Sequence, residues 1–206
     1  MLTVYVLTYI YKRLTQIKGE KIMRNERLKM MITAAMFAGI IAVAAQVMIA
    51  IPPVPFSLLT IAVMLTATIL PKEYACLAII IYILLGLGGI PVFAGMTGGP
   101  GILLGPTGGY ILATLPAVIC ISFLLDMFGH NKFVAIGANM LSVVIILSIG
   151  MVWLKMVSGI SWEGAFKGGM LIFLIPDLVK SIVAALVGVV IRRRLVQAKL
   201  IRATPL

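Results

Sequence analysis

The chain has 206 residues, of which 62% are hydrophobic and 11% are charged, and its mean hydropathy is +1.18. A soluble domain is about half apolar and about a quarter charged, so this composition excludes an ordinary soluble protein. The net charge of +11 does not predict nucleic-acid binding, because the basic residues cluster near the two ends, over 12–29 and 192–202. That distribution is what the positive-inside rule predicts for a membrane protein.

Two long stretches, residues 30–71 and 74–125, contain no charged residue. About 20 apolar residues are enough to cross the hydrocarbon core of a bilayer. We therefore predict a multi-pass protein of the cell membrane, in contact with lipid. We expect residues 1–22 to be a leader or interfacial extension, residues 23–195 to form the membrane domain, and residues 196–206 to be a basic cytoplasmic tail.

The first predicted span covers residues 31–51 and ends at the Pro-Pro-Val-Pro-Phe segment. Two shorter apolar runs follow, over 57–70 and 74–87. Each would be only about 21 Å long as a helix. Short or interrupted spans are typical of the region that holds a transporter's binding site.

The next segment, residues 89–110, is rich in glycine and proline and carries no charge. Such a sequence cannot continue a helix, and a membrane tolerates irregular backbone only where protein buries it or where it lines a cavity. Further spans are predicted over 110–128, 133–156 and 170–191, with a polar link over 157–169.

Six spans place both basic ends on the same side of the membrane, which the positive-inside rule assigns to the cytoplasm. The neutral Pro-Pro-Val-Pro-Phe and glycine-rich segments then lie outside, where they can cover a binding site. The predicted fold is an all-α integral membrane protein with six transmembrane helices and both termini cytoplasmic.

Asp177 and Lys180 are ionisable residues within the last predicted span. Their i, i+3 spacing places them on one helix face. Ionisable groups at this depth are costly and usually face a cavity or pair with each other. Two interpretations remain open, an ion pair that fixes helix packing and a polar anchor for a ligand, in which the lysine suits a carboxylate and the aspartate suits an N–H donor.

Two uncharged polar side chains also lie in predicted spans, Gln46 near the outer end of the first and Asn139 in the middle of the fifth. Each can be a helix-to-helix hydrogen bond or a ligand contact. Aromatic residues gather around the two neutral loops and favour a hydrophobic pocket there. They are Phe56, Tyr82, Phe93 and Tyr110.

Ala34, Ala38 and Ala42 are spaced four apart in the first span and form a smooth stripe. Stripes of small residues let helices approach closely. The stripe can pack within the chain's own bundle or dock to a separate membrane protein.

The glycine-rich segment is not a phosphate-binding loop, because Pro106 stands where the motif needs lysine. The sequence also has no HExxH or GxSxG motif. We therefore expect a protein that is not an enzyme and has no nucleotide site of its own. His130 is the only histidine, and neither cysteine has a partner at metal spacing, so no metal or other cofactor is expected.

Four segments together resemble the BioY family, the biotin-binding S components of energy-coupling factor (ECF) vitamin transporters. They are IPPVPFSLLT at 51–60, YILLGLGGIPVFAG at 82–95, LLGPTGGY at 103–110 and PDLVK at 176–180. One departure is Leu59, where the family pattern has glutamine.

The resemblance implies a six-helix S-component fold that captures biotin, the transported ligand, from outside. It also implies that the alanine stripe docks to a transmembrane coupling protein, which works with two cytoplasmic ATPases. A stand-alone secondary biotin transporter and an S component for another vitamin remain as alternatives. The expected substrate-binding residues are Asp177, Lys180, Asn139, Phe56, Tyr82, Phe93, Gly98, Thr107, Gly108, Gly109 and Tyr110.

Overall fold

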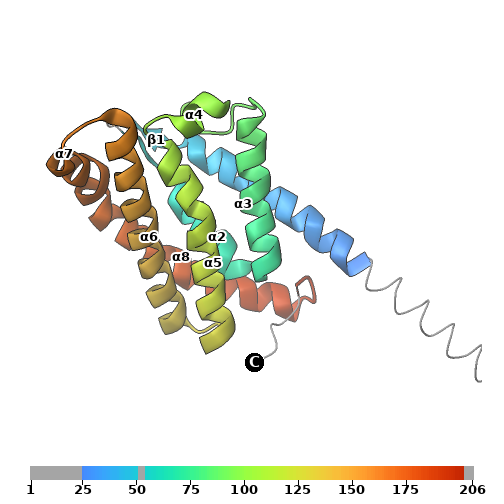
Figure 1. Ribbon diagram of the computed structural model, residues 1–206. Helices are drawn as coiled ribbons and strands as arrows, with labels where there is room; N and C mark the ends of the chain where they lie inside the picture. The colour runs from blue at the N-terminus through green and yellow to red at the C-terminus, as the bar shows by residue number, and fades with distance from the viewer. Residues whose placement is uncertain (1–24, 51–53, 202–206) are drawn as a thin grey trace, which may run out of the picture.

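A computed structural model describes residues 25–50 and 54–201, which are mostly helical (Figure 1). The predicted extension over 1–22 and positions 202–206 of the predicted tail lie outside the described residues. The bounds of the longer helices are Asn25–Gln46 for the N-terminal helix, Leu59–Ile69 for α2, Lys72–Leu87 for α3, Gly108–Phe128 for α5 and Lys132–Ser158 for α6. The last helical stretch consists of α7 (Trp162–Phe166), the π-helical turn η1 (Lys167–Leu171) and α8 (Ile172–Gln197).

Among the described residues, four helices are long and apolar enough to cross a membrane. They are the N-terminal helix, α5, α6 and the continuous stretch Trp162–Gln197. The prediction of a multi-pass membrane protein is therefore confirmed. Helices α2 and α3 are shorter, with 11 and 16 residues, which confirms that the two short apolar runs form separate short helices.

The break between α2 and α3 follows from Pro71. Leu70 has an extended conformation with ψ of 153°, because a following proline disfavours the helical conformation of the residue before it. Pro71 is itself the residue at the N-terminal cap of α3. The chain therefore reverses here without a longer loop.

The predicted polar link over 157–169 is mostly helical, because α6 ends at Ser158 and a new helix begins at Trp162. The Ser161 hydroxyl accepts a hydrogen bond from the Gly164 N–H and caps the helix. Glu163 and Lys167 form an i, i+4 ion pair at 2.6 Å. The Gly168–Gly169 pair then falls in the π-helical turn rather than ending the helix.

The small elements gather at one end of the bundle, at the top of Figure 1. Strands β1 (Met48–Ile49) and β2 (Phe56–Ser57) pair antiparallel, with Met48 opposite Ser57. Helix α4 (Pro100–Leu104) is a short helical turn inside the glycine-rich segment. The turn between α5 and α6 and the end of α8 lie at the opposite end of the bundle.

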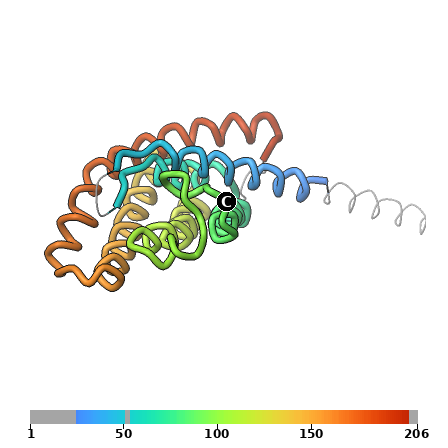
Figure 2. Tube along the Cα trace, turned by 90° about the horizontal axis from the view of Figure 1, so that it is seen from above, coloured from blue at the N-terminus to red at the C-terminus, as the bar shows by residue number. Residues whose placement is uncertain are grey.

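The core forms where α5 packs along α6 and where α2 packs along α8. Figure 2 views the bundle from the end that carries α4, with α8 in red along one side. Glycines allow the close contact between α5 and α6. A Cβ added at Gly109 would lie 2.1 Å from the Trp153 side chain, and one at Gly150 would lie 2.2 Å from the Tyr110 ring.

We predict that Gly150→Ala lowers the free energy of unfolding by about 1–3 kcal/mol, the usual cost of overpacking a core. The added methyl group must displace the Tyr110 ring. The measurement is the thermal unfolding of the detergent-solubilised chain. Gly137→Ala is the matched control in the same helix, because a Cβ there meets nothing within 4 Å. Equal stability of the two variants would contradict the packing described.

Candidate functional site

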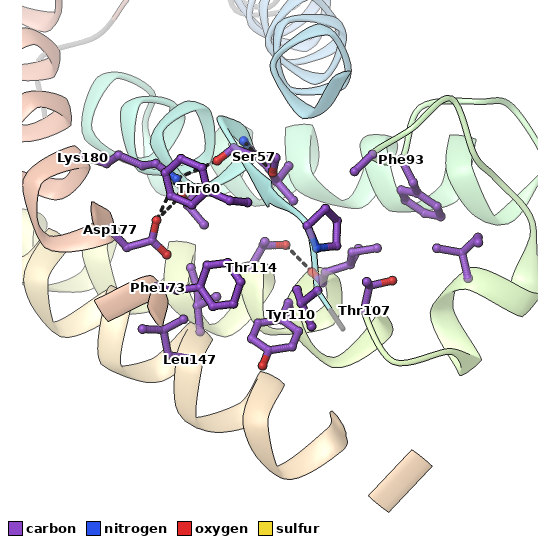
Figure 3. A pocket seen from close by; sticks show the side chains of 18 of the residues that line it. Ser57, Thr60, Phe93, Thr107, Tyr110, Thr114, Leu147, Phe173, Asp177 and Lys180 are labelled. Carbon is purple, nitrogen blue, oxygen red and sulfur yellow. Dashed lines mark hydrogen bonds and ion pairs between the residues drawn. The ribbon is translucent and has the colours of Figure 1, made fainter. Parts of the chain in front are cut away.

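A cavity of about 280 Å³ lies near the end of the bundle that carries β2 and the glycine-rich segment (Figure 3). Helices α2, α3, α5, α6 and α8 contribute to its wall, together with the segments 54–57 and 93–97. Its lining is mostly apolar with a few polar groups, as is usual for sites that bind small molecules. The polar and charged side chains in the lining, apart from two tyrosines, are those of Ser57, Thr60, Thr97, Thr107, Thr114, Asp177 and Lys180.

The two charged groups of the lining form an ion pair on α8. Lys180 Nζ lies 2.8 Å from Asp177 Oδ1, and the side chains of Lys180 and Asp177 are only 10% and 6% exposed. The i, i+3 spacing thus places both on one helix face, toward the cavity, as the sequence predicts. An ion pair this deep is tolerated only when further hydrogen bonds satisfy its members.

Those further bonds come from Ser57 of β2 and from Thr60 at the start of α2. Lys180 Nζ donates to the Ser57 carbonyl at 2.7 Å and to Thr60 Oγ1 at 3.3 Å. Thr60 Oγ1 in turn donates to Asp177 Oδ1 at 3.1 Å. The second carboxylate oxygen, Asp177 Oδ2, has no hydrogen-bond partner among the described residues, and so it can accept a bond from a guest in the cavity.

An aromatic wall stands beside the ion pair. The Phe56 ring lies 3.7 Å from Lys180 Nζ, measured to the ring centroid, in a cation–π contact. Phe173 stacks on Phe56 with 6.4 Å between centroids and an interplanar angle of 11°. Sequence reasoning missed Phe173, although its position four residues before Asp177 places it on the same helix face.

Two tyrosines line the cavity in different ways. The Tyr110 hydroxyl donates to the Gly169 carbonyl at 2.6 Å, so it is used to hold the π-helical turn and only its ring faces the cavity. The Tyr82 ring packs edge-on against Phe93, with centroids 5.6 Å apart. The Tyr82 hydroxyl is buried and has no hydrogen-bond partner in the described part of the chain.

Seven of the predicted substrate-binding residues therefore line one cavity. They are Phe56, Tyr82, Phe93, Thr107, Tyr110, Asp177 and Lys180. Ser57, Thr60, Thr114 and Phe173 also line it but were not predicted. For Thr60 the available signal was its place in the short apolar run that follows the neutral Pro-Pro-Val-Pro-Phe segment.

Four predicted residues lie outside the lining. Asn139 Nδ2 donates to Thr68 Oγ1 at 3.3 Å and to the Ser181 carbonyl at 3.4 Å, and so it connects α6 with α2 and α8. Gly98, Gly108 and Gly109 face protein atoms instead. A Cβ on Gly98 would lie 2.4 Å from the Ile90 carbonyl oxygen, and one on Gly108 would lie 1.8 Å from that of Leu103.

The predicted docking stripe on the N-terminal helix lies mostly against the chain itself. Ala34 and Ala38 are 0% exposed, and Ala42 is partly buried against the core. The stripe therefore packs internally in this structure, and its docking to another protein stays a prediction. Their small size serves close internal packing.

The described residues contain no group of three or more His, Cys, Asp or Glu side chains placed to hold a metal ion. The cavity instead offers a carboxylate acceptor, the positive charge of Lys180, several hydroxyl groups and aromatic surface. This combination suits a small organic molecule that carries both N–H and oxygen groups on an apolar body.

Comparison with known proteins places the chain among membrane transport proteins. It is 38% identical over 173 residues to "Biotin transporter BioY2" of Lactococcus lactis subsp. cremoris (strain MG1363), covering 84% of this chain and 95% of that protein. It is 34% identical over 172 residues to "Biotin transporter BioY" of Thermotoga maritima (strain ATCC 43589 / DSM 3109 / JCM 10099 / NBRC 100826 / MSB8), covering 81% of this chain and 97% of that protein.

A solved structure has the same fold. It is described as the "S-component for biotin from an ECF-type ABC transporter", and it matches with a TM-score of 0.75 and 26% identity over 82% of this chain and 93% of that chain. The model of the BioY family matches residues 16–197. The chain therefore belongs to the BioY family.

Proposed function

We propose that this chain is a substrate-binding S component that captures biotin outside the cell for uptake. The observation that carries the proposal is the Asp177–Lys180 ion pair, which is built into an apolar cavity with aromatic walls. Family membership supports it, as do relatives named as biotin transporters.

The chemistry of biotin complements this cavity. Its ureido group presents N–H donors beside a carbonyl acceptor, on an apolar bicyclic body. Asp177 Oδ2 is placed to accept an N–H. The Lys180 ammonium, whose three N–H groups bond to Asp177, Ser57 and Thr60, places a positive charge 2.8 Å from the other oxygen of the same carboxyl group. Because the carboxylate acceptor and the positive charge are adjacent, they suit a single polar end of the ligand, and the ureido group offers an N–H beside a carbonyl oxygen.

The apolar body of biotin would then lie against the aromatic wall. Phe56 and Phe173 stand next to the ion pair, and the Tyr110 ring lines the cavity further along (Figure 3). The Thr97 and Thr107 hydroxyls belong to the wall contributed by the glycine-rich segment. In this proposal the carboxylate tail points toward that segment.

We also propose a six-span topology with both termini cytoplasmic. The clustering of basic residues near the two ends supports it. The end of the bundle that carries β1, β2 and α4 would face outward. A transmembrane coupling protein and two ATPases would supply the energy for uptake, in line with the solved relative described as belonging to an ECF-type ABC transporter.

Titration of the purified chain with biotin tests the proposed function directly. We expect saturable binding of one biotin per chain by calorimetry. Thiamine and riboflavin, titrated under the same conditions, should give no saturable heat. Tighter binding of either control vitamin would assign the chain to another substrate, and a folded chain that binds none of the three would contradict the proposal.

We predict that Lys180→Ala weakens biotin binding at least tenfold, roughly 1.4 kcal/mol, because the ligand loses its cationic partner. Asp177→Asn, which keeps the side-chain shape, should have an effect of similar size. Lys155→Ala is the matched control, since Lys155 lies over the Trp162 ring and not in the cavity. Unchanged affinity in a folded Lys180→Ala variant would leave the pair a packing element only.

The Lys180→Ala variant also shows which end of biotin Lys180 contacts. Biotinamide carries no carboxylate but keeps the ureido group. If Lys180 meets the ureido end, Lys180→Ala weakens biotin and biotinamide by the same factor. If Lys180→Ala weakens the binding of biotin but not of biotinamide, Lys180 contacts the carboxylate, and the proposed orientation is reversed.

Uptake into vesicles tests whether the chain needs partners. We expect no accumulation of radiolabelled biotin by the chain alone, and ATP-dependent accumulation after reconstitution with a coupling protein and ATPases. Uptake by the chain alone, in vesicles that lack ATPases, would favour the stand-alone transporter.

A further inference from the structure

Gln46, the last residue of the N-terminal helix, connects that helix to the glycine-rich segment. Its Nε2 lies 3.1 Å from the carbonyl oxygens of Val92 and Phe93 in that segment and of Ala42 one turn earlier in the helix, and its two N–H groups are shared among these acceptors. Its Oε1 accepts from the Met96 N–H at 2.9 Å. Carbonyls meet one end of the amide and an N–H meets the other, so the orientation of the amide is determined by its partners.

These partners belong to a tight turn in the cavity wall. Phe93 and Thr97 form a two-way bridge, with N–H to carbonyl distances of 3.0 and 3.3 Å. Phe93, Ala94 and Thr97 all line the cavity. Gln46 therefore bonds both limbs of the turn, the 92–93 limb through its nitrogen and Met96 through its oxygen.

The turn contains a conformation that needs support. Met96 has a φ of +56°, which is sterically unfavourable for a residue with a side chain. Its side chain is 67% exposed, so packing does little to hold it in place. Such conformations persist where surrounding bonds enforce them, and the bond from the Met96 N–H to Gln46 is one of these.

The same helix end also leads into the other irregular part of the wall. Val47 follows Gln46 directly, and its carbonyl accepts from the Leu58 N–H at 3.0 Å. Strand β1 then pairs with β2, which carries Phe56 and Ser57. Both irregular segments of the cavity wall are thus attached to one helix end.

We propose that Gln46 is a positioning residue that holds the 92–97 turn against the cavity and thereby sets how fast the cargo enters and leaves. The cargo is biotin, so this step rests on the proposed function. The amide bonds run to backbone atoms of the turn, and Gln46 itself does not line the cavity. Gln46 therefore acts on the opening of the wall and not on contacts with the guest.

Hydrogen–deuterium exchange of the full chain tests the first half of this proposal without any ligand. In Gln46→Leu, the peptide covering 92–97 should exchange about tenfold faster, the factor expected for one or two net hydrogen bonds. Peptides from α5 and α6 should be unchanged. Val47→Ala is the matched control, since the neighbouring Val47 side chain is 56% exposed. Unchanged exchange over 92–97 would overturn the proposal.

Biotin kinetics test the second half. Gln46→Leu should raise both the association and the dissociation rate constants by about tenfold, so that Kd changes much less than either. A structural defect alone would reduce the binding-competent fraction without raising both rates. Rate constants like those of the wild type, or a change in Kd alone, would contradict the proposal.

Gln46→Glu is a second variant that keeps the side-chain shape and the acceptor for Met96 but turns an oxygen toward the Val92 and Phe93 carbonyls. It should also accelerate both rates, and unchanged rates in this variant would count against the proposal. If the wild-type chain binds no biotin, the proposed function fails, while the exchange experiment still decides whether Gln46 holds the turn.

Discussion

A buried ion pair sets the main constraint on this structure. Asp177 and Lys180 lie inside an apolar bundle, where unpaired charges are expensive. The fold must bring polar partners to them, and it does so with the Ser57 carbonyl of β2 and with Thr60 at the start of α2. That requirement fixes α2 against α8 and places the irregular 54–57 segment beside the pair. The cavity lies next to the place where these elements meet. Asp177 Oδ2, which has no hydrogen-bond partner among the described residues, is available there to a guest.

Helix α2 is attached to the bundle along its whole length. At the cavity end it contacts the ion pair through Thr60. Near its other end Thr68 bonds to Asn139 of α6. Its last residue, Ile69, accepts a hydrogen bond from Arg192 of α8 at 2.6 Å. Since α2 has only 11 residues, these bonds hold a helix that is too short to be stabilised by its own length. The wall that α2 contributes is therefore held by hydrogen bonds at both ends of the helix.

Sequence reasoning located the ion pair and the two short helices, because charge in an apolar span and proline between apolar runs are strong local signals. It failed where the outcome depends on tertiary contacts. The polar link over 157–169 carried no signal that residues 162–169 are helical, and there the Gly169 carbonyl is held by the Tyr110 hydroxyl from another helix. Asn139 and the alanine stripe face the interior of the bundle, and their spacing alone could not distinguish an internal partner from an external one. Phe173 was missed because a phenylalanine in an apolar span carries no signal until its neighbours on the helix face are considered.

We propose that the Asp177–Lys180 pair serves a guest in the cavity as well as the fold. A crystal structure of the chain with biotin is the sharpest test of this double role. We expect the vitamin between the Phe56–Phe173 wall and Tyr110, with a polar atom of biotin within hydrogen-bonding distance of Asp177 Oδ2 or Lys180 Nζ. Biotin bound elsewhere, with the cavity empty and the pair bonded only to Thr60 and Ser57, would contradict it.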